Sequence, residues 1–310
     1  MKRIALVLGV LAAAALPVPA HAAFPGRNGP ILYGWRYISG EERDEMYFAA
    51  GIWRISATTQ HAQSIGCIDR PVSEDQNACA DIDYSDPTAS PDGRLVVFDT
   101  GGALALAHTD GTGLRDLATT VPAVGDPAFS PDGTRIAFVA AGSRHRGVWI
   151  VGLRTGDRAR RLVDDATSPV WSSRGWIAFC RRSGIYRIRP DGSGLRRVVA
   201  NGKTPAWSPH GSRLAFTRDE IDRRGRIVTH AGLFSVDIAG SRLRALARLN
   251  GGKALDIAWS PNGRQVAILD EQDLWTTDLR SGRPHGLTWA FPTGGAYSGW
   301  TYGIDWQPLP

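Results

Sequence analysis

The chain has 310 residues, of which 43% are hydrophobic, with a formal net charge of +6 and three cysteines. That length suits one large all-β domain or two ordinary ones. A zinc site needs three or four clustered ligands, and the sequence contains no such cluster. Residues 143–226 hold 19 Lys and Arg against 7 Asp and Glu, which predicts a solvated basic face or a surface that meets an acidic partner.

The first 22 residues have the three parts of a signal peptide. Lys2 and Arg3 are followed by an unbroken apolar run and by a small-x-small cleavage site at Ala20-His21-Ala22. The apolar run is too short to span a bilayer comfortably, so we expect no transmembrane segment after cleavage. We therefore expect a mature single domain over residues 23–310 that is secreted or periplasmic, where nucleic acid is not an expected partner.

The next part of the chain, up to residue 86, departs from the pattern that follows. Cys67 and Cys79 flank an 11-residue segment, and an exported chain permits a disulfide there, which would stabilise the fold by about 3 kcal/mol. The acidic stretch 68–86 is either a functional loop or a tolerated insertion. Residues 39–50, and later the arginine-rich residues 218–228, are predicted as two further insertion loops.

Residues 126–139 then introduce a pattern that recurs along the chain. Asp-Pro-Ala-Phe-Ser-Pro-Asp-Gly followed by Thr-Arg-Ile-Ala-Phe-Val predicts a strand, a tight turn and a second strand. Copies or near copies place the turn serine 40, 42, 36 and 52 residues apart, a period typical of β-propellers. These serines are Ser90, Ser130, Ser172, Ser208 and Ser260.

A second motif, out of phase with the first, completes each repeat. It is an apolar strand, a Gly-containing turn and a short strand, so each repeat has four strands and there are six repeats. Residues 28–33 match the second half of the first motif, whose missing first half is residues 303–308. The sequence therefore predicts an all-β, six-bladed β-propeller of four-stranded blades, closed by pairing of the C-terminal strand into the first blade.

These repeats, over residues 24–310, resemble the TolB-like six-bladed β-propellers, which are relatives of WD repeats. The resemblance implies a periplasmic protein that binds protein partners at its top face, the side of the ring where the inner strands begin. TolB-like proteins carry an additional N-terminal domain, which we expect this chain to lack because its first blade follows the predicted signal peptide closely. The repeats also resemble the propellers of prolyl oligopeptidases, but the chain has no Gly-x-Ser-x-Gly elbow.

Alignment of the repeats predicts a binding site at the mouth of the central channel. The residue three positions before the motif aromatic is polar in five repeats and is Gly303 in the sixth, where Asp305 is the nearby polar residue. Such a ring could bind a hard cation such as Ca²⁺, accept hydrogen bonds from a partner's side chain, or only cap nearby backbone amides. The predicted site residues are Asp86, Asp126, Ser168, Thr204, Asp256 and Asp305.

We therefore expect a monomeric, non-enzymatic interaction module that binds a protein or peptide of the cell envelope or the extracellular space. No cofactor is expected, although Ca²⁺ at the channel mouth stays open. One alternative is a cation-dependent propeller enzyme of the lactonase or lyase type, which small apolar residues on the inner strands disfavour. Another is an envelope carbohydrate-binding propeller that would use Trp35, Trp289 or Trp300 as stacking platforms. The other tryptophans, and Cys180, are expected in the core.

Overall fold

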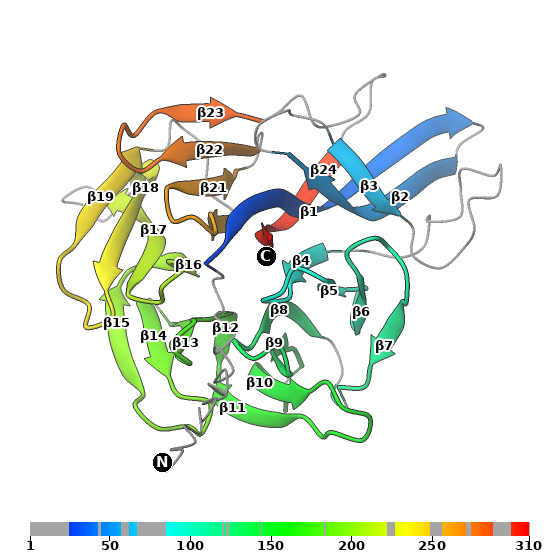
Figure 1. Ribbon diagram of the computed structural model, residues 1–310, viewed down its shortest axis with the longest axis horizontal. Helices are drawn as coiled ribbons and strands as arrows, with labels where there is room; N and C mark the ends of the chain where they lie inside the picture. The colour runs from blue at the N-terminus through cyan, green and yellow to red at the C-terminus, as the bar shows by residue number, and fades with distance from the viewer. Residues whose placement is uncertain are drawn as a thin grey trace, which may run out of the picture.

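A computed structural model shows six four-stranded antiparallel sheets arranged as blades around a central channel (Figure 1). The predicted six-bladed propeller is therefore confirmed. Among the described residues, no helix is long and apolar enough to cross a membrane. The predicted signal peptide lies outside them. The structure describes residues 25–42, 45–56, 62–66, 85–119, 121, 124–142, 144–182, 184–221, 227–248, 256–270, 274–287 and 299–309.

Each blade contains four strands that follow one another from the channel outward. Blade 1 consists of β24 (Gly299–Leu309), β1 (Arg27–Glu42), β2 (Glu45–Ile55) and β3 (Ala62–Gly66). Blade 2 consists of β4 (Ser85–Ala89), β5 (Leu95–Asp99), β6 (Leu104–His108) and β7 (Arg115–Leu117). Blade 3 consists of β8 (Val124–Phe129), β9 (Arg135–Ala140), β10 (Gly147–Gly152) and β11 (Arg160–Asp164).

The second half of the chain repeats this arrangement. Blade 4 consists of β12 (Ala166–Trp171), β13 (Ile177–Arg181), β14 (Gly184–Ile188) and β15 (Arg196–Ala200). Blade 5 consists of β16 (Lys203–Trp207), β17 (Arg213–Ile221), β18 (Ile227–Asp237) and β19 (Arg244–Arg248). Blade 6 consists of β20 (Asp256–Trp259), β21 (Gln265–Leu269), β22 (Leu274–Asp278) and β23 (Pro284–Gly286).

The ring closes where the end of the chain pairs with its beginning. Strand β24 is antiparallel to β1, with Ile31 opposite Trp306 and Tyr33 opposite Ile304. The Trp306 indole N–H donates to the Gly29 carbonyl at 2.9 Å. This pairing gives β1 its inner neighbour and removes the edge that an open array would leave, as the sequence predicts.

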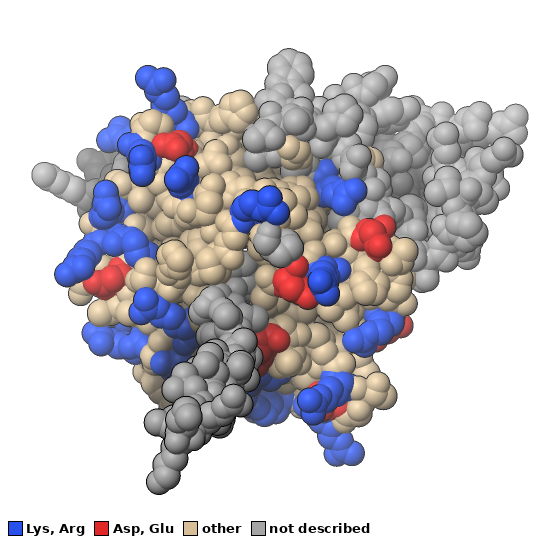
Figure 2. Space-filling view, viewed as in Figure 1, with Lys and Arg blue, Asp and Glu red and all other residues tan. Residues whose placement is uncertain are grey.

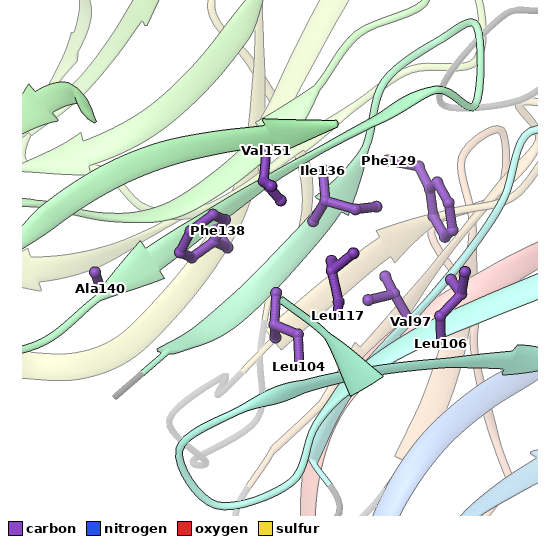
Figure 3. Packing of buried hydrophobic residues seen from close by; sticks show 9 residues of the cluster. All are labelled: Val97, Leu104, Leu106, Leu117, Phe129, Ile136, Phe138, Ala140 and Val151. Carbon is purple, nitrogen blue, oxygen red and sulfur yellow. The ribbon is translucent and has the colours of Figure 1, made fainter. Parts of the chain in front are cut away.

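The core lies between the blades. Six clusters of buried apolar residues each join two neighbouring blades. Between blades 2 and 3, Leu104, Leu106 and Leu117 face Ile136 and Phe138 (Figure 3). Because each cluster needs side chains from two repeats, one blade alone cannot bury its apolar surface, and the ring is the stable unit.

The repeated Ser-Pro-Asp-Gly turn is held by its own side chains. In blade 3, the Arg135 N–H donates to the Ser130 hydroxyl at 2.9 Å and the Thr134 N–H donates to Asp132 at 3.0 Å. Gly133 has a φ of +67°, which is the left-handed conformation that glycine adopts readily. The motif residues are therefore part of the scaffold.

Two segments predicted as insertion loops instead extend hairpins, so that prediction is wrong. Strands β1 and β2 stay paired to Glu42 and Glu45, through most of residues 39–50. Strands β17 and β18 stay paired to Ile221 and Ile227, within 218–228. Pairing satisfies backbone groups that a loop would leave to water, and Figure 1 shows the β1–β2 hairpin extending beyond the outline of the ring.

Candidate functional site

A β-bulge at the start of the inner strand directs polar side chains to the channel mouth. In blades 2 to 5 the strand register skips a dipeptide of Asp, Ser or Thr followed by Pro. The first residue of each dipeptide has positive φ, from +43° at Thr204 to +51° at Ser168. Such bulges change the direction of a side chain, and Asp tolerates the left-handed conformation better than most residues.

A cavity of about 210 Å³ lies at this mouth, and all six blades line it. All six residues that the repeat alignment singles out, from Asp86 to Asp305, are among its lining residues. The structure therefore brings together positions that are up to 219 residues apart in sequence. What these residues bind is a separate question from where they lie.

The carboxylates at the mouth join neighbouring blades by accepting backbone hydrogen bonds. Asp126 accepts from the Ser168 N–H at 2.9 Å, Asp256 accepts from the Ile304 N–H at 2.9 Å, and Asp305 accepts from the Ala89 N–H at 2.9 Å. Each bond crosses from one blade to the next. The capping interpretation therefore describes one role of these groups, although the amides belong to the adjacent repeat.

Burial favours the neutral form of all four carboxyl groups. It raises the pKa of Asp256 to about 8 and that of Asp305 to about 6. The pKa of Asp86 rises to about 7, first because of burial and then because of the negative charges of Asp126 and Asp99. Burial also raises the pKa of Asp126. A cation placed at this mouth would reverse these shifts by stabilising the charged form.

No such cation comes from the described part of the protein. There, no Lys or Arg lies within ion-pair distance of the four carboxylates. Among all the residues that the structure describes, no group of three His, Cys, Asp or Glu is arranged to hold a metal ion. The mouth is therefore an acidic cavity that can accept hydrogen bonds or a positive charge from outside.

The prolines after the bulge residues also line the cavity, and sequence reasoning missed them. Pro87, Pro127, Pro169 and Pro205 form an apolar collar next to the polar ring. The Thr88 hydroxyl donates to the Pro127 carbonyl at 2.8 Å and so fixes the collar between two blades. The repeated Asp-Pro, Ser-Pro and Thr-Pro dipeptides in equivalent positions were the available signal.

Several predicted features cannot be placed. Cys67, Cys79 and Trp289 lie outside the described residues, as does all of 68–84. The side chains of Trp35 and Trp300 are also outside the description. Cys180 is a free cysteine that packs against the cluster between blades 4 and 5, and burial raises the pKa of its thiol to about 11.

Comparison with known proteins shows which propellers this chain resembles. No family model matches the chain. A protein TolB homolog from Chlorobium luteolum is 35% identical over 117 residues, which cover 34% of this chain and 26% of that protein. The structure of a putative TolB from Agrobacterium tumefaciens superposes with a TM-score of 0.62 at 15% identity, covering 91% of this chain and 100% of that one. The chain is a six-bladed β-propeller that is similar to TolB proteins in its fold and, over about a third of its length, in its sequence.

Another relative of this chain is the Tol-Pal system protein TolB of Gluconobacter oxydans, which is 39% identical over 102 residues. That match covers 30% of this chain and 22% of the relative. The chain thus spans about a quarter of the length of the curated relatives that it matches. The similarity extends to the fold and its repeats.

Proposed function

We propose that this TolB-like propeller is a non-enzymatic, exported interaction module whose channel mouth binds a positively charged group of an envelope or extracellular protein or peptide. The observation that carries the proposal is the acidic cavity, where Asp86, Asp126, Asp256 and Asp305 lie together without a cationic neighbour among the described residues. The name of the relative from Gluconobacter oxydans, a Tol-Pal system protein, supports a partner in the cell envelope.

The shape of the site supports a small inserted group. A cavity of about 210 Å³ is large enough for one amino-acid side chain or a chain terminus, but not for a folded surface. The proline collar would contact the apolar part of a Lys or Arg side chain, while the carboxylates would meet its charged end. A peptide amine would use the same two features.

Short peptides provide a direct test. We expect peptides with a free amino terminus, Lys or Arg to bind the full chain in a calorimetric titration, and acetylated, neutral versions to bind roughly tenfold more weakly or not at all. Asp86→Asn should weaken binding, because it removes a negative charge while Asn keeps the left-handed backbone of Asp86 (φ +50°).

A matched control is Asp165→Asn. Asp165 also has positive φ, +49°, but it is exposed, pairs with Arg146 and is not part of the cavity lining. Equal binding of charged and neutral peptides, or equal binding by Asp86→Asn and wild type, would contradict the proposal.

The enzyme alternative depends on a cation in the channel. Asp256 and Asp305 each use both carboxylate oxygens to accept backbone N–H groups, at 2.8 to 2.9 Å. We therefore expect millimolar Ca²⁺ to leave the melting temperature of wild type and of Asp126→Ala unchanged, as measured by calorimetry. Stabilisation by Ca²⁺ that Asp126→Ala abolishes would favour a metal site.

A further inference from the structure

The end of the ring opposite the channel mouth carries an unusual surface on blades 4 and 5. Exposed Leu195 and Leu243, at 48% and 51% exposure, are the large hydrophobic residues most open to solvent among those described. Both lie in the turn between the third and fourth strands of their blades, directly before Arg196 and Arg244. Because the two leucines occupy equivalent positions of neighbouring blades, they offer a binding partner two apolar points of contact.

Both turns are closely packed, and the turn of blade 5 contacts blade 4. Gly240, in the turn of blade 5, is so close to β15 of blade 4 that a Cβ on it would lie 2.4 Å from the Val198 carbonyl oxygen. In blade 4, a Cβ on Gly194 would lie 2.9 Å from the ring of Trp176 in the same blade. The backbone of the two turns that carry the leucines is therefore closely packed.

Arginines surround the leucines on the same end of these blades. We call this set the arginine–leucine face; apart from Leu195, Leu243 and Trp176 it comprises Arg174, Arg187, Arg189, Arg196, Arg197, Arg213, Arg242 and Arg244. Two acidic residues, Asp191 and Asp237, lie in the same turns. Figure 2 shows the ring along its axis, and over β12–β19 basic side chains outnumber acidic ones on the face seen.

Among the described residues, the arginines of this face outnumber its acidic residues and form no ion pair with them. None of the ion pairs there involves one of the eight arginines. Asp191 and Asp237 instead accept hydrogen bonds from the N–H groups of Ser193 and Ser241 in their own turns, at 2.9 and 2.8 Å. Burial, and then the nearby positive charges of Arg196 and Arg189, lower the pKa of Arg187.

Backbone carbonyls and an indole ring hold several of the guanidinium groups in place. Arg174 donates to the His210 carbonyl of blade 5 at 2.9 Å, and Arg189 donates to the Arg174 carbonyl at 2.7 Å. The guanidinium groups of Arg187 and Arg189 lie 3.9 and 3.7 Å from the centre of the Trp176 ring. Fixed arginines lose little conformational entropy when they meet a ligand.

We propose that the arginine–leucine face docks the propeller on the surface of an anionic lipid bilayer. Exposed Leu side chains among arginines are a combination that binds the headgroup region, where apolar groups enter the lipid and cations meet phosphate. A flat, phosphate-rich surface offers partners to both leucines and to the arginines of this face that are exposed, which are Arg174, Arg196, Arg197, Arg242 and Arg244. The channel mouth, at the other end of the inner strands, then faces away from the membrane.

Vesicle flotation with the full chain tests this docking. The chain should float with phosphatidylcholine vesicles that contain about 30% phosphatidylglycerol and not with pure phosphatidylcholine, and binding should weaken at about 0.5 M salt. Arg196→Gln/Arg197→Gln should lower the partition coefficient about 30-fold, at about 1 kcal/mol per arginine. Leu195→Ser/Leu243→Ser should lower it roughly tenfold or more.

The control is Arg181→Gln/Arg182→Gln, which removes two adjacent arginines at the other end of the same blade. This variant should bind vesicles like wild type, and circular dichroism should show all variants folded. The proposal is overturned if neutral vesicles bind equally well, if the control loses binding like Arg196→Gln/Arg197→Gln, or if the serine variant binds like wild type. Capture of an acidic protein without vesicle binding would overturn it too. Peptide binding at the channel mouth is measured without lipid, so the two proposals can fail separately.

Discussion

Asp126 combines a structural and a candidate binding role in one side chain. Its φ of +47° and the bulge around it direct the carboxylate toward the channel mouth. There it accepts the Ser168 N–H of the next blade and lies close enough to Asp86 to raise that residue's pKa. Burial raises the pKa of Asp126, and one of its oxygens accepts the Ser168 N–H, so the other oxygen is the candidate to contact a ligand.

Replacing Asp126 separates these contributions. We expect Asp126→Ala to lower the free energy of unfolding by about 1–3 kcal/mol, because the Ser168 N–H loses its acceptor. Asp126→Asn should cost less, since its amide oxygen can accept the same bond and Asn tolerates positive φ. Urea denaturation measures both values.

The control is Asp165→Ala, which places alanine at a similar φ of +49° but at an exposed position. It corrects for the backbone strain of alanine in the left-handed region. If Asp126→Ala and Asp165→Ala cost the same, the bond between the blades contributes nothing measurable.

Among the structural elements, β24 contributes to three blades. It supplies the inner strand of blade 1 and buries Trp306, which is 1% exposed, against the cluster shared with blade 6. Ala89 of blade 2 also depends on β24, because its N–H donates to Asp305. One strand thus connects blades 6, 1 and 2.

Deleting residues 303–310 should open the ring. Loss of a buried tryptophan alone costs about 3–5 kcal/mol, and we expect the melting temperature to fall by roughly 10 °C or more. Calorimetry should compare the melting temperature of the deletion variant with that of Trp306→Phe, which keeps most of the packing. The comparison distinguishes the loss of ring closure from the loss of one side chain. An unchanged melting temperature of the deletion variant would show that closure does not stabilise the fold.

The strands that could be predicted are those that repeat. The motif aromatics and the Ser-Pro-Asp-Gly turn recur because every blade packs against an equivalent neighbour, so the period and the six blades are visible in the sequence. The hairpins at 39–50 and 218–228 were missed because charged residues suggested loops, whereas backbone pairing does not depend on side-chain polarity. The bulges could not be predicted, because an Asp-Pro, Ser-Pro or Thr-Pro dipeptide does not by itself show that the strand register skips two residues.

On the scale of the whole molecule, closure of the ring creates the chemistry of the channel mouth. The alignment of repeats predicted which residues meet there. It could not predict that Asp305 accepts the N–H of Ala89, 216 residues away, or that Asp86 and Asp256 have strongly raised pKa values. Those properties come from burial by all six blades together.

These carboxyl groups should make the stability of the whole protein depend on pH. Their pKa values in the folded state, about 6, 7 and 8 for Asp305, Asp86 and Asp256, exceed the value of an unfolded aspartate. The folded state therefore binds more protons between about pH 4 and pH 8, so stability is highest at the acidic end and falls as pH rises through this range. We expect the melting temperature to decrease from about pH 5 to about pH 8.5.

The carboxyl of Asp256 has the highest of these values. Asp256→Asn should therefore flatten the upper part of the pH profile, as followed by calorimetry at constant ionic strength. A melting temperature that rises steadily over the same range would show that the carboxyl groups are charged and well solvated in the folded protein.

The pairing of β24 with β1 also determines when blade 1 can fold relative to the other blades. Blades 2 to 6 are each built from neighbouring sequence, whereas blade 1 must wait for a strand whose Trp306 lies 277 residues after its partner Gly29. Contacts between such distant residues form slowly, and until then β1 exposes an edge to which other chains can add. We therefore expect a newly synthesised chain to pass through an open-ring state in which the edge of β1 can pair with other chains. A chaperone that covers β1 would prevent this association until β24 is in place.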